Sequence, residues 1–250
     1  MLTEERFHII LEVLEERQAV TVTELTQLLG ASESTIRRDL TTLHQQGRLI
    51  KVHGGATALP AGYQMVDEQV EVRQSRSTPE KHAIGQYAAS LIRDDDFVFI
   101  DAGTTTGAML EYIGPTRAVF VTNAAGHGKK LAQKGLRVML LGGEMKAATE
   151  AVVGSDTIRG LQRYHFTKGF FGTNGISTQG GYTTPDAAEA MVKEVAMGRC
   201  QQRFVLADHT KFHVVSSVTF GQLSDAVILT DRAEDDIWAS KTEITEVEQP

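Results

Sequence analysis

The sequence predicts an α/β protein in which a small helical module precedes a larger domain built on a largely parallel sheet. Three observations lead to this prediction. Residues 1–58 hold three short helical patterns and then a hairpin pattern. From Phe97 onward, short apolar runs alternate with helical patterns, as in parallel sheets covered on both faces. At 250 residues, with 41% hydrophobic and 23% charged residues, the chain is long enough for one small and one medium domain.

The first two helices of the small module are indicated by periodicity and capping signals. An apolar stripe at helical spacing is formed by Phe7, Ile10, Leu11 and Leu14. Thr21 and Glu24 have the spacing of a capping box, so a second helix is expected to begin there and run to Leu29. Gly30 is expected to end it.

A third helix and a hairpin complete the module. Ser32 is placed to cap a helix that buries Ile36, Leu40 and Leu43. The hairpin is predicted from residues 49–52 and 56–59, paired across a Gly54-Gly55 turn. The third helix and the hairpin together offer outward polar side chains suited to a DNA groove and its phosphates, and the candidates are Ser32, Ser34, Thr35, Arg37, Arg38, His44, Lys51 and His53.

The positive charge of the module is concentrated in its second half. Residues 1–58 contain six Lys/Arg against eight Asp/Glu, a formal net charge of −2. Residues 34–58 contain four basic residues and one acid, a net of +3. Binding to DNA is therefore expected to be site-directed and salt-sensitive. The alternative interpretation is that Arg37 and Arg38 merely solvate a helix and pair with Asp39 or nearby glutamates.

The domain boundary is predicted near Leu59 to Gln64, because Pro60-Ala61-Gly62 interrupts the periodicity. This divides the chain into a module at 1–59, a linker or adapter with some helical pattern at 60–77, and a larger domain at 78–250. The larger domain opens with a helix at Thr78-Pro79-Glu80, with Pro in the first turn. Its buried strands are predicted at 97–100, 118–121, 138–141, 169–171, 204–206 and 227–229, and its later helices near 105–113, 124–134, 156–163 and 186–199.

Polar residues follow most of these strands. Ligands of open parallel sheets bind beyond the carboxyl ends of the strands, so this rim is the expected binding site. The candidate ligand-binding residues there are Asp101, Gly103, Thr104, Thr105, Thr106, Thr122, Asn123, Asn174, Gly175, Asp208 and Lys211. The turn from Gly103 to Thr106 joins a strand to a helix and offers backbone N–H groups, hydroxyls and a helix dipole to a phosphate. It lacks the Gly-Lys-[Ser/Thr] ending of a Walker loop, and alone it could be only a capped turn.

Other features exclude several classes of protein. The formal net charge of −7 argues against a ribosomal or membrane-surface protein. The single cysteine, Cys200, permits no disulfide within the chain, and its helical apolar context indicates a packed thiol. The amino terminus lacks a signal-peptide pattern and no apolar stretch is long enough to span a bilayer, so a cytoplasmic protein is expected. The histidines are dispersed without metal-ligand spacing, so neither a metal site nor a cofactor is expected.

The sequence resembles the DeoR family of bacterial transcriptional regulators. Ser32, Thr35, Ile36, Arg37, Arg38, Asp39 and Leu40 stand in the family's order, followed by a wing reading Lys51-Val52-His53-Gly54-Gly55-Ala56. The resemblance covers nearly the whole chain. It implies an amino-terminal winged helix-turn-helix and a carboxy-terminal sensor domain related in fold to ribose-5-phosphate isomerase and coenzyme A transferases. Members typically repress operons of sugar metabolism and release DNA when a phosphorylated sugar binds.

The resemblance also implies roles for individual residues. It suggests that the Gly103 loop receives the phosphate of a sugar phosphate, that Asn123 and Asn174 contact hydroxyls, and that Lys211 supplies a countercharge. The alternative is an isomerase-like enzyme with a DNA-binding head, using Asp101, Glu189 and Asp208 as acids or bases and Lys211 to stabilise an enediolate. Against it, Gly172-Thr173-Asn174-Gly175 stands where the isomerases carry Asp-Gly-Ala-Asp, and residues 180–185 replace their glycine-rich Lys loop. Glu189 is kept as a weaker site candidate, since it could simply pair with Lys193 in solvent.

The resulting expectation is a transcription factor that represses a phosphotransferase-type sugar operon and is not an enzyme. Its partners would be double-stranded operator DNA, a phosphorylated sugar such as fructose 1-phosphate or tagatose 6-phosphate, and further copies of itself in a homodimer or homotetramer, with no membrane. Ligand binding at the sheet rim would reorient residues 60–80 and misalign the paired recognition helices.

Overall fold

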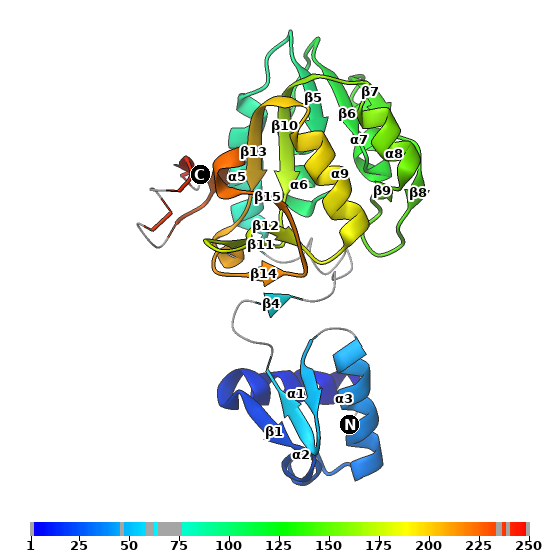
Figure 1. The fold of residues 1–250 in the computed structure, drawn as a ribbon, viewed down its shortest axis with the longest axis vertical. Coiled ribbons are helices and arrows are strands. Elements are labelled where there is room, and N and C mark those ends of the chain that lie inside the picture. The colour runs from blue at the N-terminus through cyan, green and yellow to red at the C-terminus, as the bar shows by residue number, and fades with distance from the viewer. Residues whose placement is uncertain are drawn as a thin grey trace. The chain divides into compact units, whose positions relative to one another are not determined.

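The computed structural model describes residues 3–45, 48–58, 63–64, 77–233, 237–238 and 241–248. The chain divides into two compact units, Met1–Val66 and Asp67–Pro250 (Figure 1). Most of the expected linker at 60–77, including its helical pattern, lies outside the described residues. Within that stretch the structure describes the short strand β4 (Tyr63–Gln64) and Ser77.

The N-terminal unit contains three helices and a three-stranded antiparallel sheet. Its elements are α1 (Thr3–Arg17), β1 (Ala19–Thr21), α2 (Val22–Leu29), α3 (Glu33–Gln45), β2 (Ile50–Val52) and β3 (Gly55–Thr57). The predicted capping box is confirmed, since the Thr21 backbone N–H donates to Glu24 Oε2 at 2.8 Å and the Glu24 N–H donates to Thr21 Oγ1 at 3.2 Å. Gly30 ends α2 in the left-handed conformation, with φ of 59°. The core is fully buried at Ile10, Leu25, Ile36, Leu40 and Leu43.

The hairpin differs from its prediction in its turn and in its partner. Val52 pairs with Gly55, so the turn consists of His53 and Gly54 rather than of the two glycines. Gly55 instead belongs to β3, and its other neighbour is β1, giving the strand order β1-β3-β2. A side chain at Gly55 would overlap the carbonyl oxygen of Val20. The glycine is therefore needed for the close approach of β1, a strand that the sequence pattern did not indicate.

The C-terminal unit is built on a seven-stranded sheet in which every adjacent pair whose register is described runs parallel. Its order is β17-β16-β13-β10-β5-β6-β7. The strands are β5 (Phe97–Ile100), β6 (Val119–Thr122), β7 (Arg137–Leu140), β10 (Phe166–Gly172), β13 (Cys200–Leu206), β16 (Val227–Thr230) and β17 (Ile244–Glu246). Six of the seven lie where they were predicted. The seventh, β17, lies in a segment where no strand was predicted.

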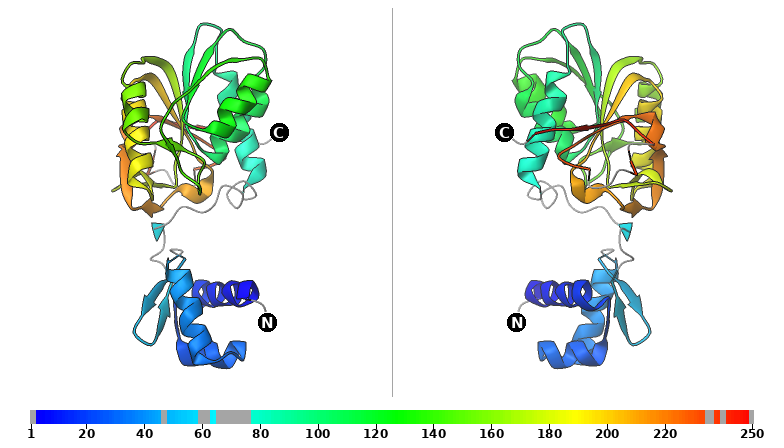
Figure 2. Two further views of the ribbon diagram at one scale, coloured as in Figure 1. Left: turned by 90° about the vertical axis from the view of Figure 1, so that its right-hand side faces the viewer. Right: turned by 90° about the vertical axis from the view of Figure 1, so that its left-hand side faces the viewer.

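Helices cover both faces of this sheet, as predicted (Figures 1 and 2). They are α5 (Thr78–Ser90), α6 (Thr104–Tyr112), α7 (Ala125–Gln133), α8 (Ser155–Leu161) and α9 (Ala187–Met197). Alternate residues of β5 face opposite sides of the sheet. Val98 and Ile100 pack with α5, α6 and α7 in one apolar core, while Phe99 packs with α8 and α9 in another. Helix α5 is capped by Ser77 rather than by Thr78.

Short strands outside the seven-stranded sheet form smaller sheets of their own. They are β8 (Glu144–Met145), β9 (Val152–Val153), β11 (Gly175–Ser177), β12 (Gly181–Thr184), β14 (Val215–Ser216) and β15 (Val218–Gly221), with 3-10 turns at His209–Lys211 and Leu223–Asp225. Strands β11, β12 and β15 form an antiparallel sheet. The stretch at 180–185, expected to be a loop, is therefore largely strand. Trp238 is buried against Phe212, which fixes part of the carboxy-terminal segment.

Candidate DNA-binding surface and ligand cavity

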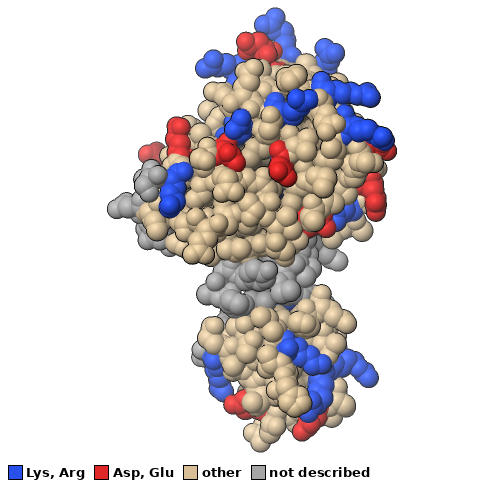
Figure 3. Space-filling view, viewed as in Figure 1, with Lys and Arg blue, Asp and Glu red and all other residues tan. Residues whose placement is uncertain are grey.

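The exposed face of α3 carries the side chains predicted to meet DNA. Ser34, Arg37 and Arg38 are exposed and Thr35 is half-buried, while Ile36 and Leu40 turn into the core. Basic side chains gather over this part of the N-terminal unit in the space-filling view (Figure 3). Arg37 makes an ion pair with Glu33 at 3.2 Å, in which both side chains are more than half exposed. Such a pair is weak in water and leaves the guanidinium able to bind a phosphate or a base edge.

Ser32 organises the start of α3 through its hydroxyl. Its Oγ accepts a hydrogen bond from the Thr35 backbone N–H at 3.3 Å and lies 2.9 Å from the hydroxyl oxygens of both Ser34 and Thr35. Three hydroxyl groups therefore cluster at the exposed amino-terminal end of the helix. This is the end of a recognition helix that contacts base edges in helix-turn-helix complexes.

The wing is held against α3 by polar contacts. Lys51 donates from Nζ to Thr41 Oγ1 at 2.7 Å, and His44 Nδ1 lies 3.2 Å from the carbonyl oxygen of Leu49. His53 is exposed in the turn between β2 and β3. Lys51 and His44 thus position the wing against α3.

Asp39 does not pair with its neighbouring arginines, so this part of the alternative interpretation is wrong, whereas the pair between Arg37 and Glu33 agrees with its other part. Its carboxylate is buried and accepts two hydrogen bonds from Arg6 of α1, at 2.7 Å from Nε and 3.1 Å from Nη2. Arg38 has no ion pair among the described residues. The acid of the Arg-Arg-Asp sequence therefore holds the helix in place, while both arginines remain on the surface.

The C-terminal unit contains a cavity of about 370 Å³ beyond the carboxyl ends of β5 and β6. Its walls come from α5, α6, α7 and the segment at 149–150. They are formed by Thr78, Lys81, His82, Ala102, Gly103, Thr104, Gly107, Ala108, Leu110, Glu111, Ala124, Gly126, His127, Lys130, Thr149 and Glu150. This volume is within the usual range for small-molecule sites.

The predicted phosphate loop contributes two of its residues to the cavity. Gly103 is the N-cap of α6, and Gly103 and Thr104 line the wall. Thr105 and Thr106 are buried, and Thr106 Oγ1 lies 2.7 Å from the carbonyl oxygen of Asp101. The first two positions are thus placed to meet a ligand, and Thr106 shapes the turn.

Lys81 is a cavity residue that the sequence reasoning missed. It is 5% exposed and lines the same cavity as the start of α6. A signal was present, because Lys81, Ile84 and Ala88 share one face of α5 and that face is otherwise apolar. A lysine buried at a polar cavity supplies the positive charge that an anionic ligand requires.

Asp101, Glu189 and Lys193 are buried, and Glu189 and Lys193 bind different partners rather than each other. Lys193 makes an ion pair with Asp101 and donates to the carbonyl oxygen of Gly172 at 3.0 Å. Asp101 Oδ2 also accepts the Gly172 backbone N–H at 3.0 Å. Glu189 accepts from Thr149 Oγ1 and lies 3.3 Å from Lys146 Nζ. The expectation that Glu189 and Lys193 could pair in solvent is therefore wrong.

The remaining predicted rim residues make internal contacts and do not line the cavity. Thr122 donates to the carbonyl oxygen of Ile100 at 2.6 Å, and Asn123 Nδ2 donates to that of Val152 at 3.2 Å. Asn174 accepts from Thr184 Oγ1 at 3.1 Å, and Asp208 caps the turn that contains Lys211. Gly175 is buried in β11. The carboxylates required by the isomerase alternative, Asp101, Glu189 and Asp208, are all engaged in this way.

His127 brings a neutral imidazole to the cavity wall. Burial lowers the pKa of His127 to about 4, and the nearby Asp101 only partly opposes this effect. The ring is uncharged at neutral pH, so it cannot supply the countercharge of a phosphate. A Cβ at Gly107 would lie 3.0 Å from His127 Nε2, so the glycine makes room for the ring.

Three further features of the described residues bear on function. No group of three or more His, Cys, Asp or Glu side chains among them could hold a metal ion. Burial raises the pKa of Cys200 to about 12, as expected for a packed thiol. In the parts of the chain that the structure describes, no helix combines the length and apolar character that a membrane crossing requires.

Comparison with known proteins accounts for both units. Residues 6–60 match the DeoR-like helix-turn-helix domain, and residues 76–232 match the DeoR C-terminal sensor domain. The chain is 40% identical to the HTH-type transcriptional regulator FruR of Bacillus subtilis, over 94% of this chain and 93% of that protein. It is 35% identical to the lactose phosphotransferase system repressor of Streptococcus mutans, over 99% of each chain. It is 34% identical to the transcriptional repressor GlcR of B. subtilis, over 93% and 90%.

Among solved structures, ribose 5-phosphate isomerase A of Methanocaldococcus jannaschii matches 53% of each chain, with 12% identity and a TM-score of 0.40. The winged helix-turn-helix unit and the α/β unit with its polar cavity define a two-domain transcriptional regulator with a sensor domain. The chain belongs to the DeoR family of transcriptional regulators. It is a DNA-binding regulator and not an enzyme.

Proposed function

We propose that this protein represses an operon for the uptake and use of a sugar through a phosphotransferase-type system, and that a phosphorylated sugar releases it from its operator. Support comes from relatives named as lactose phosphotransferase system repressors, which are 35% identical in S. mutans and 32% identical in Staphylococcus aureus. The observation that carries the proposal is the cavity of the sensor domain, which Lys81 and the amino-terminal end of α6 both line.

The physical basis of effector binding is charge and amide donation. The α6 amino terminus presents backbone N–H groups and the positive end of the helix dipole at Gly103 and Thr104. Lys81 adds an ammonium group to the lining of the same cavity. A phosphate between them gains charge-assisted hydrogen bonds. We propose that Asp101, Thr105, Thr106, Thr122, Asn123, Asn174, Gly175, Glu189, Asp208 and Lys211 support or extend this site.

We further propose that the regulator binds DNA as a homodimer or homotetramer. A single winged helix-turn-helix unit makes few phosphate contacts, and pairing two units on repeated half-sites multiplies the affinity. The ligand must bind the free and operator-bound states unequally, with a coupling free energy of about 1–3 kcal/mol in typical regulators.

The test measures operator release directly. Fluorescence anisotropy would follow binding of the purified protein to DNA from upstream of its own gene, at two salt concentrations and with a panel of sugar phosphates. We expect salt-sensitive, sequence-dependent binding that one or a few sugar phosphates weaken at least tenfold, with the unphosphorylated sugars inactive. Binding that ignores every sugar phosphate, or a sugar phosphate that is converted to its isomer, would refute the proposal.

A further inference from the structure

The wall of the sensor cavity carries one acid whose role the phosphate-binding argument does not explain. Glu150 lines the cavity, and its carboxylate has no ion pair or hydrogen bond with any residue that the structure describes. The other acid of the wall, Glu111, is paired with Lys130 at 3.1 Å and lies 3.7 Å from His82. Glu150 is therefore the acid of this wall that remains able to bind a ligand.

The backbone at Glu150 is held in a conformation that side-chain-bearing residues rarely adopt. Its φ is 54°, in the left-handed region, which disfavours L-residues by about 1–2 kcal/mol. The conformation is imposed by its neighbours. The Glu150 N–H donates to the Lys146 carbonyl oxygen at 2.9 Å, and the Lys146 N–H donates to that of Ala151 at 2.9 Å. A glycine would relieve this strain, yet a glutamate stands here.

The segment around Glu150 is anchored on both sides. Ala151 forms a β-bridge with Ala124, and the Val152 N–H donates to the Asn123 carbonyl oxygen at 2.7 Å, which ties the segment to the end of β6. On the other side, Lys146 pairs with Asp186 at 2.6 Å, at the start of α9.

These anchors direct the Glu150 side chain toward α7. Its Oε2 lies 3.5 Å from the position that a Cβ would take at Gly126. Gly126 itself lines the cavity. The carboxylate is thus delivered to the α7 wall, whereas Lys81 belongs to α5.

The wall with Lys81 and the wall with Glu150 suit different parts of a ligand. A carboxylate repels a phosphate group, but it accepts strong hydrogen bonds from hydroxyl donors and can bind two neighbouring hydroxyls at once. Given the proposed function, on which this inference rests, the phosphate belongs between Lys81 and Gly103. We infer that Glu150 accepts hydrogen bonds from hydroxyl groups on the carbon chain of the effector and thereby determines which phosphorylated sugar the protein accepts.

The test compares ligands with and without the carbon chain. Wild-type protein and the variants Glu150→Ala, Glu150→Gln and Glu150→Asp would be titrated calorimetrically with inorganic phosphate and with a panel of sugar phosphates. Glu150→Ala is expected to weaken the preferred sugar phosphate at least tenfold and to leave inorganic phosphate affinity unchanged or slightly higher. Glu150→Asp keeps the charge on a shorter arm, so it is expected to change the order of preference among the sugars. Glu194→Ala, at an exposed acid of α9, is the matched control and should behave as wild type.

The outcomes distinguish this inference from the proposed function. If wild-type protein binds no sugar phosphate more tightly than inorganic phosphate, the proposed function fails. If wild-type protein prefers a sugar phosphate and Glu150→Ala has the same preference and affinity, only the role of Glu150 is overturned. A lower melting temperature with an unchanged order of preference in both Glu150→Gln and Glu150→Asp also overturns it, because Glu150 would then serve only the folded structure.

Discussion

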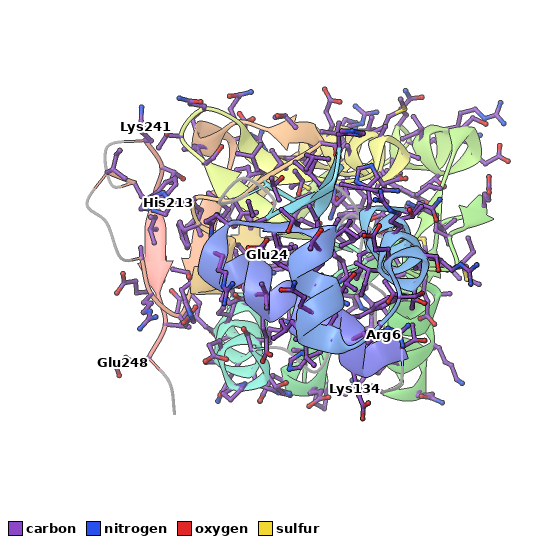
Figure 4. All side chains as sticks on the ribbon, turned by 90° about the horizontal axis from the view of Figure 1, so that it is seen from below. Arg6, Glu24, Lys134, His213, Lys241 and Glu248 are labelled. Atoms are coloured by element: carbon purple, nitrogen blue, oxygen red, sulfur yellow. The ribbon has the colours of Figure 1, made fainter. Side chains whose placement is uncertain are left out.

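Arg6 of α1, which is labelled in Figure 4, donates two hydrogen bonds to Asp39 of α3, at 2.7 Å and 3.1 Å. These bonds join two helices through residues that are 33 positions apart in the chain. Asp39 is buried at 4% exposure, directly beside two exposed arginines. The bidentate geometry fixes both the position and the rotation of α3. The orientation of the DNA-contacting face therefore depends on a residue that does not itself lie on it.

Replacing Arg6 should destabilise the N-terminal unit. Arg6→Ala leaves the Asp39 carboxylate buried without this cation, so we expect the variant to unfold at a clearly lower urea concentration than wild type. Urea unfolding of the variant, followed by far-UV circular dichroism, checks this. The double variant Arg6→Ala, Asp39→Asn should recover part of the loss, and a single variant as stable as wild type would contradict the role assigned to the pair.

Removing a surface arginine of α3 should act on DNA alone. Arg37→Ala or Arg38→Ala is expected to weaken operator binding by about 1–3 kcal/mol, or roughly tenfold to a hundredfold, if the side chain reads a base. Ligand-induced thermal stabilisation should be unchanged, because both side chains belong to the N-terminal unit, whereas the ligand cavity lies in the C-terminal unit. Anisotropy and thermal-shift measurements on the same samples separate the two effects. Equal loss of both would indicate misfolding.

The two lysines suggested for effector binding can be distinguished by parallel substitution. Lys211 was expected from the family resemblance to supply a countercharge, whereas Lys81 lines the cavity, as does Lys130, which is paired with Glu111. We expect Lys81→Ala to raise the sugar phosphate concentration needed for operator release at least tenfold, and Lys211→Ala to have a smaller effect. If Lys211→Ala has the larger effect, the phosphate binds near the 3-10 turn at His209–Lys211 instead.

The stability of the sensor domain should depend on His127 at mildly acidic pH. Its pKa is about 4 in the folded protein, against an ordinary value of 6.5. The unfolded chain therefore binds a proton that the folded chain resists. The stabilisation is present above pH 6.5 and is lost as the pH falls toward 4, by up to about 3 kcal/mol. His127→Gln should flatten the difference between melting curves at pH 7 and pH 4.5, and an unchanged pH profile would contradict this account.

Gly55 should tolerate no side chain. A Cβ there would overlap the Val20 carbonyl oxygen in the neighbouring strand β1, so Gly55→Ala must push β1 and β3 apart. We expect a loss of about 2 kcal/mol or more in the stability of the N-terminal unit. Gly54→Ala is the comparison. It has open space around it but a φ of 84°, so it should suffer only from backbone strain.

Periodicity and local signals were sufficient for most of the secondary structure. The capping box at Thr21 and Glu24 depends on residues three apart, and the apolar runs at β5, β6 and β13 depend on residues that are adjacent. Strand β1 and the antiparallel strands β11 and β12 were missed, because short strands are stabilised by partners distant in sequence. The same reason explains the hairpin turn, whose register depends on β1 as well as on its own two glycines.

The residues of the candidate site likewise fall into two groups: those that a local sequence pattern indicates and those that only the packing brings to the cavity. Gly103 and Thr104 could be identified from a strand-to-helix turn, since helix N-termini bind anions by local geometry. Lys81 and Glu150 were not identified from the sequence as cavity residues. The pattern around Lys81 indicates only a helix face with one lysine among apolar residues, and the pattern around Glu150 indicates only a loop. Glu189 and Lys193 were four residues apart and suggested a helix pair, but their true partners, Thr149 and Asp101, come from other elements.

By itself, the sequence determined the order of the helices and main strands, the polar rim and the resemblance to a family of regulators, because these depend on neighbours along the chain. The tertiary structure decided which side chains come together: Arg6 with Asp39, Lys193 with Asp101, and Lys81 with Gly103 and Thr104 in the lining of one cavity. Such pairings join charges across tens of residues. They follow from how the elements pack, and no pattern of nearby residues encodes that packing.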